Sequence, residues 1–161
     1  MSNAAPSVPT ARIKGIHPGW ILIVLDVIGL GIASYLSIVE LGGGSPYCGA
    51  LHGCETVAAS KYAWIGPLPV AVYGVMLSVL LLTLAIAWVR SDKPALLDVH
   101  YGLSLVGVIF EIYFLTLQVF VIKAVCIWCA SYGISLVLRF LVAFAIWRRQ
   151  RRLRAEAEAS A

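Results

Sequence analysis

Four cysteines carry the most evident chemistry in this chain, and they fall into two pairs. Cys126 and Cys129 form a C-x-x-C motif in "AVCIWC", and Cys48 and Cys54 lie in "YCGALHGC". Residues three apart on a helix have Cβ atoms about 5 to 6 Å apart, so a small adjustment lets a disulfide form and open. The free amides and positive dipole of a first helical turn also favour the thiolate, the form that attacks disulfides. The motif therefore predicts a reversible redox pair at Cys126 and Cys129.

The second pair lies in a segment with more backbone freedom. Gly49 and Gly53 stand between Cys48 and Cys54, and residues 55–60 have the pattern of a short helix. If this mobile pair meets the C-x-x-C pair, thiol-disulfide exchange can pass two electrons from a soluble donor to the second site.

The elements that must position these cysteines are hydrophobic. Of the 161 residues, 61% are hydrophobic and only 12% are charged, which excludes an ordinary soluble domain. Apolar segments long enough to cross a membrane, about 20 residues each, occupy residues 20–41, 68–89, 99–122 and 124–147. The first segment is too long and too charged for a cleaved secretion signal, so we expect it to be retained. The prediction is an all-α polytopic membrane protein with four transmembrane helices and a short helix in an outer loop.

The basic residues orient this arrangement. Cationic side chains collect in cytoplasmic segments, and here they precede the first span, separate the second from the third, and follow the fourth as five arginines within residues 148–154. The opposite side has only Lys61 and Lys123. Both termini are therefore expected in the cytoplasm, and all four cysteines on the outer side, where disulfides persist. The arginines favour contact with anionic membrane lipid; nucleic acid is not expected, because no basic, aromatic-bearing domain accompanies them.

These predictions divide the chain into three parts. Residues 1–18 form a flexible N-terminal tail, residues 19–148 the transmembrane domain with its outer loop at 42–67, and residues 149–161 a basic cytoplasmic tail.

Two structural interpretations compete with redox chemistry. Four cysteines could bind zinc, but the pairs are separated by two spans and the loop spacing exceeds the usual one, and we predict no metal. The cysteines could instead form permanent disulfides in a small membrane scaffold or assembly subunit. The very short loop that a C-x-x-C bridge closes would stabilise such a scaffold little.

The order of these features resembles the vitamin K epoxide reductase family. The shared features are an outer loop with Cys48 and Cys54, a following serine at Ser60, the "PVAVYG" stretch at residues 69–74, and "CIWC" opening the fourth span. Each feature alone is weak, but the ordered set on four spans is fairly specific, and it covers residues 20–147.

The resemblance implies a four-helix bundle and a reaction. Bacterial members of this family couple quinone reduction to disulfide formation in exported proteins, through a thioredoxin-like partner. By resemblance, Cys129 would face a quinone of the menaquinone, ubiquinone or vitamin K type, Cys126 would exchange with Cys54, and Cys48 would meet the partner. Many relatives carry a fused thioredoxin-like domain, whereas this chain stops at Ala161. We therefore expect a bacterial inner-membrane homologue that is served by a separate periplasmic or extracytoplasmic dithiol protein.

The expected quinone pocket lies beside the C-x-x-C motif. Its candidate residues are Ser60, Val70, Tyr73, Tyr113, Phe114 and Tyr132. Two positions depart from the family pattern. Val70 stands where some members have an asparagine that contacts the quinone, and Gly133 stands where a tyrosine is used. Tyr132 is one position earlier, about 100° around the helix.

Several ionisable residues lie within the predicted spans. We expect Asp26 and Arg139 to form a structural ion pair in the inner half of the membrane, with a proton route as the alternative. Glu111 is expected to be protonated or to share Arg139. His17 and His100 are expected at the membrane interface. Small residues at every fourth position of the first span predict close helix packing: Gly29, Ala33 and Ser37.

His52 lies between the loop cysteines. It would be solvated, or it would assist proton transfer.

Overall fold

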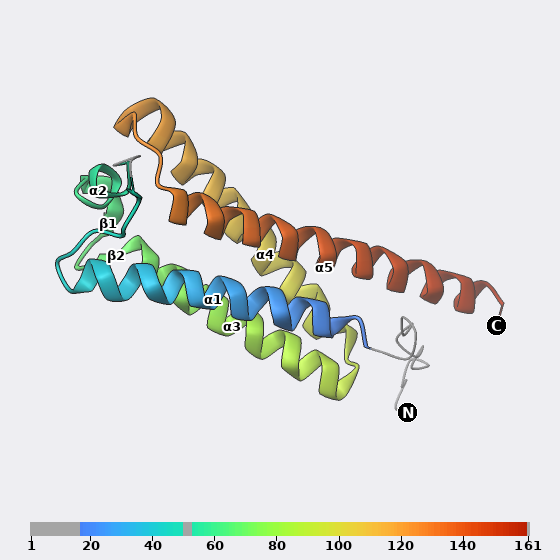
Figure 1. The fold of residues 1–161 in the computed structure, drawn as a ribbon. Coiled ribbons are helices and arrows are strands. Elements are labelled where there is room, and N and C mark those ends of the chain that lie inside the picture. The colour runs from blue at the N-terminus through green and yellow to red at the C-terminus, as the bar shows by residue number, and fades with distance from the viewer. Residues whose placement is uncertain (1–16, 50–52, 161) are drawn as a thin grey trace.

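The computed structural model describes residues 17–49 and 53–160, and it is almost entirely helical (Figure 1). Its elements in chain order are α1 (Gly19–Leu41), α2 (Gly53–Ala58), the 3-10 turn η2 (Lys61–Ala63), β1 (Trp64–Ile65), β2 (Leu68–Pro69), α3 (Val70–Ser91), α4 (Pro94–Thr116), the π-helical segment η3 (Leu117–Ile122) and α5 (Ile127–Ala159). Four helical stretches are long and apolar enough to cross a membrane, which confirms the predicted spans of this multi-pass membrane protein. His52 and residues 1–16 of the predicted N-terminal tail lie outside the described residues.

The four long helices form a bundle. α1 packs against α3 and α5, and α4 packs against the same two helices, so the order around the bundle is α1, α3, α4, α5. The cysteine loop, which we define as residues 42–67 between α1 and α3, folds over one end of the bundle beside the start of α5 (Figure 1). We call this end the cysteine end.

Two helices end at positions other than those that the sequence predicts. α5 continues to Ala159, through most of the predicted tail, because residues 148–159 are good helix formers without glycine or proline. α2 ends at Ala58, so Ser60 follows the short helix, and its hydroxyl donates to the carbonyl of Val57 at 2.7 Å. The two-residue strands β1 and β2, joined through Gly66 at φ 63°, had no signal in the sequence pattern.

The bundle interior contains a fully buried ion pair. The Arg139 Nη1 atom lies 3.5 Å from Asp26 Oδ1, which confirms the predicted pair. The Arg139 guanidinium also donates to the hydroxyls of Ser135 at 2.9 Å and Ser78 at 3.4 Å. Among the described residues Arg139 has no ion pair with Glu111, so of the two alternatives predicted for Glu111 the shared cation is wrong. Asp26 therefore neutralises Arg139, and Glu111 is a second buried acid outside this ion pair.

His100 was expected at the interface, and this prediction is wrong. Its side chain is 1% exposed, and its Nε2 lies 3.2 Å from Asp26 Oδ2. His100 is on the second turn of α4, and the acid opposite it on α1 supplies a polar partner inside the bundle. His17 lies at the start of α1, where it contacts Asp92 at 2.9 Å.

The small-residue stripe on α1 is buried, which confirms close packing there. A Cβ atom at Gly29 would collide with the Arg139 guanidinium. The glycine therefore makes the space that lets the arginine cross from α5 to α1. Ala33, one turn later, lies against α3 at Gly74.

Replacing one member of the buried pair should destabilise the bundle. We expect Asp26→Asn to lower the free energy of unfolding by about 3 kcal/mol, because Arg139 loses its counter-ion away from water. The measurement is denaturation of the purified protein in mixed detergent micelles. Asp98→Asn, an exposed position on α4, is the control and should change little. An Asp26→Asn variant as stable as the control would contradict this account of Arg139.

Candidate functional site

Cys48 and Cys54 form a disulfide in the cysteine loop, with their Cα atoms 5.8 Å apart. Cys54 is the second residue of α2 and is fully buried, whereas Cys48 lies on the preceding segment and is 8% exposed. Of the two sulfurs, Cys48 is therefore the one closer to the surface. This disulfide closes a loop of few residues, so it constrains the unfolded chain little and can be exchanged without a large loss of stability.

Cys126 and Cys129 lie at the start of α5, where the sequence predicted them, and both are free thiols. Cys126 is the N-cap residue, and its sulfur accepts a hydrogen bond from the Cys129 backbone N–H at 3.3 Å. The Cys126 N–H itself donates to the side-chain oxygen of Gln118 at 2.8 Å. A capping sulfur lies where the unpaired amides of the helix converge, which is a site that favours negative charge.

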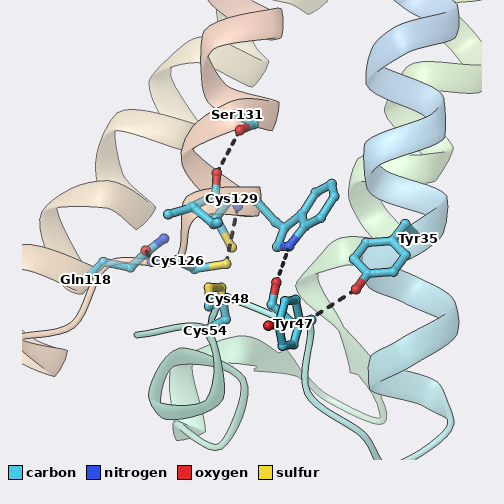
Figure 2. The surroundings of a disulfide bond; sticks show 10 residues. Tyr35, Tyr47, Cys48, Cys54, Gln118, Cys126, Cys129 and Ser131 are labelled. Carbon is cyan, nitrogen blue, oxygen red and sulfur yellow. Dashed lines mark hydrogen bonds between the residues drawn. A yellow bond between two sulfur atoms is a disulfide. The ribbon is translucent and has the colours of Figure 1, made fainter. Parts of the chain in front are cut away.

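Gln118 is a site residue that sequence analysis missed. It is fully buried in η3, whose wider π-helical turn points this side chain back toward Cys126 (Figure 2). The chain then reverses at Lys123, which has a left-handed φ of 58°. The available signal was a lone amide in an apolar span, whose polar group needs a buried partner.

The local hydrogen bonds make Cys126 acidic for a thiol. The Cys129 side chain hydrogen-bonds the Cys126 sulfur and is the largest cause of the lowered pKa of Cys126; the backbone N–H groups of Cys129 and Trp128 act in the same direction, and burial opposes them. Cys126 therefore favours the thiolate, which is both a good nucleophile and a good leaving group in disulfide exchange.

The structure brings the two cysteine pairs together. Cys48, Cys54 and Cys126 belong to one buried cluster, and Cys129 packs against it (Figure 2). The close approach depends on Gly53, because a Cβ atom there would collide with the carbonyl oxygen of Val125. The loop disulfide therefore lies directly on the segment that leads into the C-x-x-C motif.

Aromatic side chains hold the loop in this position. The Trp128 indole N–H donates to the carbonyl of Tyr47 at 2.9 Å, and the Tyr47 N–H donates to the hydroxyl of Tyr35 at 3.3 Å (Figure 2). The Tyr35 and Trp128 rings contact each other with centroids 4.6 Å apart. These contacts connect α1, the loop and α5, and they involve the residues directly before Cys48 and Cys129.

An apolar cavity of about 300 Å³ lies inside the cysteine end of the bundle, and Cys129 forms part of its wall. The other lining residues come from all four long helices and the cysteine loop, and almost all are apolar. Four of the six candidate pocket residues line it: Val70, Tyr73, Phe114 and Tyr132. This volume is at the lower end of the range for ligand pockets, about 300 to 1,000 Å³.

The remaining candidates lie elsewhere. Tyr113 is 58% exposed on α4, next to Phe110 with ring centroids 6.4 Å apart, and Ser60 stays in the cysteine loop. The Tyr132 hydroxyl donates to the carbonyl of Gly74 at 3.0 Å and lies 3.2 Å from the Ser78 hydroxyl. Its ring lines the cavity while its polar atom is already paired.

Glu40 and Glu111 also line this cavity. Sequence analysis noted Glu111 as an acid within a span but did not place it beside the cysteines.

The vitamin K epoxide reductase family model matches residues 20–144, which include all four cysteines and all four spans up to the last turns of α5. The chain belongs to the vitamin K epoxide reductase family. A comparison with curated proteins gave no match. Membership indicates a membrane thiol oxidoreductase, and the clustered sulfurs beside an apolar cavity are consistent with that chemistry.

The lowered pKa of Cys126 predicts how its reactivity changes with pH. The rate of Cys126 alkylation should follow the thiolate fraction, falling about tenfold per pH unit below the pKa, and its midpoint should lie below the value of about 8.5 for a free cysteine. Cys129→Ala removes the thiol that hydrogen-bonds Cys126, so the midpoint should rise toward the free value. Peptide mapping after timed iodoacetamide treatment measures both. Equal midpoints in the two proteins would contradict the stated cause.

Gly53→Ala should separate the two cysteine pairs. The added methyl cannot fit beside the Val125 carbonyl, so the loop must move away from Cys126. A displacement of about 1 Å can slow a reaction about 100-fold, and we expect a loss of that order in the rate of exchange between the pairs. Rapid acid quenching and alkylation after reduction of the loop measures this rate. Gly102→Ala is the matched control, because a Cβ atom at Gly102 meets nothing within 4 Å.

Proposed function

We propose that this protein is a quinone-dependent thiol oxidase that drives disulfide formation in exported proteins. It takes electrons from a separate thioredoxin-like dithiol protein on the outer side of the bacterial inner membrane. The observation that carries the proposal is the position of the C-x-x-C pair, between a loop disulfide and an apolar cavity within the bundle.

The first step is exchange with the partner. A partner thiolate attacks Cys48, the more exposed sulfur of the loop disulfide, and Cys54 leaves as a thiolate. The second partner thiol then attacks the mixed disulfide and releases Cys48. The partner leaves oxidised, and the loop holds the two electrons as a dithiol.

The second step is exchange within the chain. The Cys54 thiolate attacks Cys126 of a Cys126–Cys129 disulfide, and Cys129 leaves. Cys48 then attacks Cys54 in the bridge, and Cys126 leaves. The lowered pKa of Cys126 supports this direction, because it favours departure as a thiolate. The product has a loop disulfide and a reduced C-x-x-C pair, which are the sulfur states in the structure.

The mostly apolar lining of the cavity suits a quinone ring. Val70, Phe114 and the Tyr132 ring would hold a flat apolar ring against the Cys129 side of the wall. Val106 and Phe110 line the cavity and are also exposed on the surface of α4, so they would form a lateral opening for a carrier dissolved in lipid. A bound quinone would supply the oxidant, taking two electrons and two protons and leaving as the quinol.

The uneven distribution of basic residues supports the outer location of the site. Arg90 and Lys93 lie near the junction of α3 and α4, at the end of the bundle opposite the cysteines, and the five arginines lie on the far part of α5. By the positive-inside rule, these segments would lie in the cytoplasm and the cysteine loop would lie outside.

Cysteine variants test the electron route. In lipid nanodiscs with menadione as the oxidant, we expect the parental protein to oxidise both a reduced thioredoxin-like protein and dithiothreitol. Cys48→Ala should lose oxidation of the protein donor but keep that of dithiothreitol, which can reduce a Cys126–Cys129 disulfide directly. Cys129→Ala should lose both activities by about 1,000-fold or more, because no sulfur remains beside the cavity. Quinone absorbance gives the rates.

Alkylation of the parental protein before and after donor addition separates this function from a scaffold role. Fixed disulfides would leave the number of modifiable cysteines unchanged, and a parental protein that behaved this way without reducing menadione would overturn the proposal.

A further inference from the structure

The second buried acid is Glu111. Its side chain is on α4, is 7% exposed and lines the same cavity as Cys129. Within residues 17–49 and 53–160, its Oε1 atom has no hydrogen-bond partner and its carboxyl forms no ion pair. Leaving a buried acid unpaired costs stability. Packing alone gives no reason for a carboxyl at this position.

The fold makes room for this carboxyl. A Cβ atom at residue 133 would lie 2.7 Å from Glu111 Oε1 and 2.8 Å from its Cγ, so the side chain rests on the bare backbone of Gly133. Gly133 follows Cys129 by four residues, which is about 6 Å along the same face of α5. Phe114, about one turn further along α4 from Glu111, packs in the cluster that contains Cys126. The carboxyl therefore lies one helical turn deeper than the reactive sulfurs.

The other polar groups of the cavity are less suited to moving a proton there. The Tyr132 hydroxyl already donates to the Gly74 carbonyl. Glu40 is at the last turn of α1 and also lines a second, surface pocket with residues of the cysteine loop, so it lies at the mouth. Glu111 is the enclosed acid whose proton is not committed to another protein group among the described residues.

We propose that Glu111 is a further catalytic residue, which carries a proton from the Cys129 thiol to a quinone oxygen. The inference rests on the proposed function, whose disulfide exchange steps do not say how protons reach the quinone. As the Cys126–Cys129 disulfide forms, two electrons pass to the quinone. The protonated Glu111 carboxyl gives its proton to the nearer quinone oxygen, and the carboxylate so formed accepts the Cys129 proton, which returns Glu111 to its initial state. The second proton comes from water, replacing the one that Cys126 released when it became a thiolate.

The test compares Glu111→Gln with Glu111→Asp in nanodiscs, using menadione and dithiothreitol. General acid–base catalysis contributes about 100-fold or more, so we expect Glu111→Gln to lose about that factor in kcat. Glu111→Asp keeps an acid on a shorter side chain and should recover part of the rate. Glu156→Gln, the same substitution at an exposed position of α5, should match the parental protein.

Two further measurements need no quinone. Exchange between the loop pair and the C-x-x-C pair should run at the parental rate in Glu111→Gln, because the sulfurs do not use this carboxyl. The infrared difference spectrum between the reduced and oxidised C-x-x-C pair should contain a carboxyl band in the parental protein, and that band should be missing in Glu111→Gln.

The outcomes separate this inference from the proposed function. A Glu111→Gln variant that reduces menadione at the parental rate would overturn the role of Glu111 and leave the oxidase intact. If Glu111→Gln loses both the internal disulfide exchange and quinone reduction, Glu111 has a structural role, and the proposed proton transfer is overturned. A parental protein that cannot reduce menadione would refute the oxidase itself. If Glu111→Gln does not fold, Glu111→Asp carries the test, and a parental rate with no change in the carboxyl band would count against the proposal.

Discussion

The close approach of the cysteine loop to the start of α5 is the constraint on which the site depends. Disulfide exchange requires one sulfur to reach another in line, and a loop that only sometimes met the membrane helices would make that step rare. Here the backbone at Gly53 lies against the Val125 carbonyl, and Trp128 hydrogen-bonds the residue before Cys48. The entropic cost of ordering the loop is met during folding and is not repeated in each turnover.

This approach requires helices that keep their positions, and contacts in the half of the bundle away from the cysteine end hold them in place. Lipid offers no hydrophobic drive for helix association, so small residues and polar contacts must hold the helices together. Gly29 lets Arg139 reach Asp26, and the same carboxylate also contacts His100 on α4. One acid thus connects α1, α4 and α5.

The sequence predicted what is local or periodic, and it missed what depends on tertiary contact. Apolar length located four spans, and cysteine spacing identified both pairs, because each signal is complete within a few turns of chain. His100 was misplaced because its burial depends on an acid 74 residues away, and Gln118 was missed because its partner is a backbone amide across a π-turn. Tyr113 and Phe114 look alike in sequence, yet the helix rotation buries only Phe114 at the cavity.

The two cysteines of the C-x-x-C motif have different surroundings, and the difference suits their proposed roles. Cys126 caps the helix outside the span, where Gln118 and the amides of the first turn can support a negative sulfur. Cys129 lies on the wall of an apolar cavity, where a lone charge would be costly and a proton must leave together with the electrons. A thiolate is needed where sulfur exchanges with sulfur, and a proton acceptor is needed where sulfur gives electrons to a carrier in lipid. Only two residues lie between Cys126 and Cys129, yet the proposed mechanism needs an acid beside Cys129 and none beside Cys126.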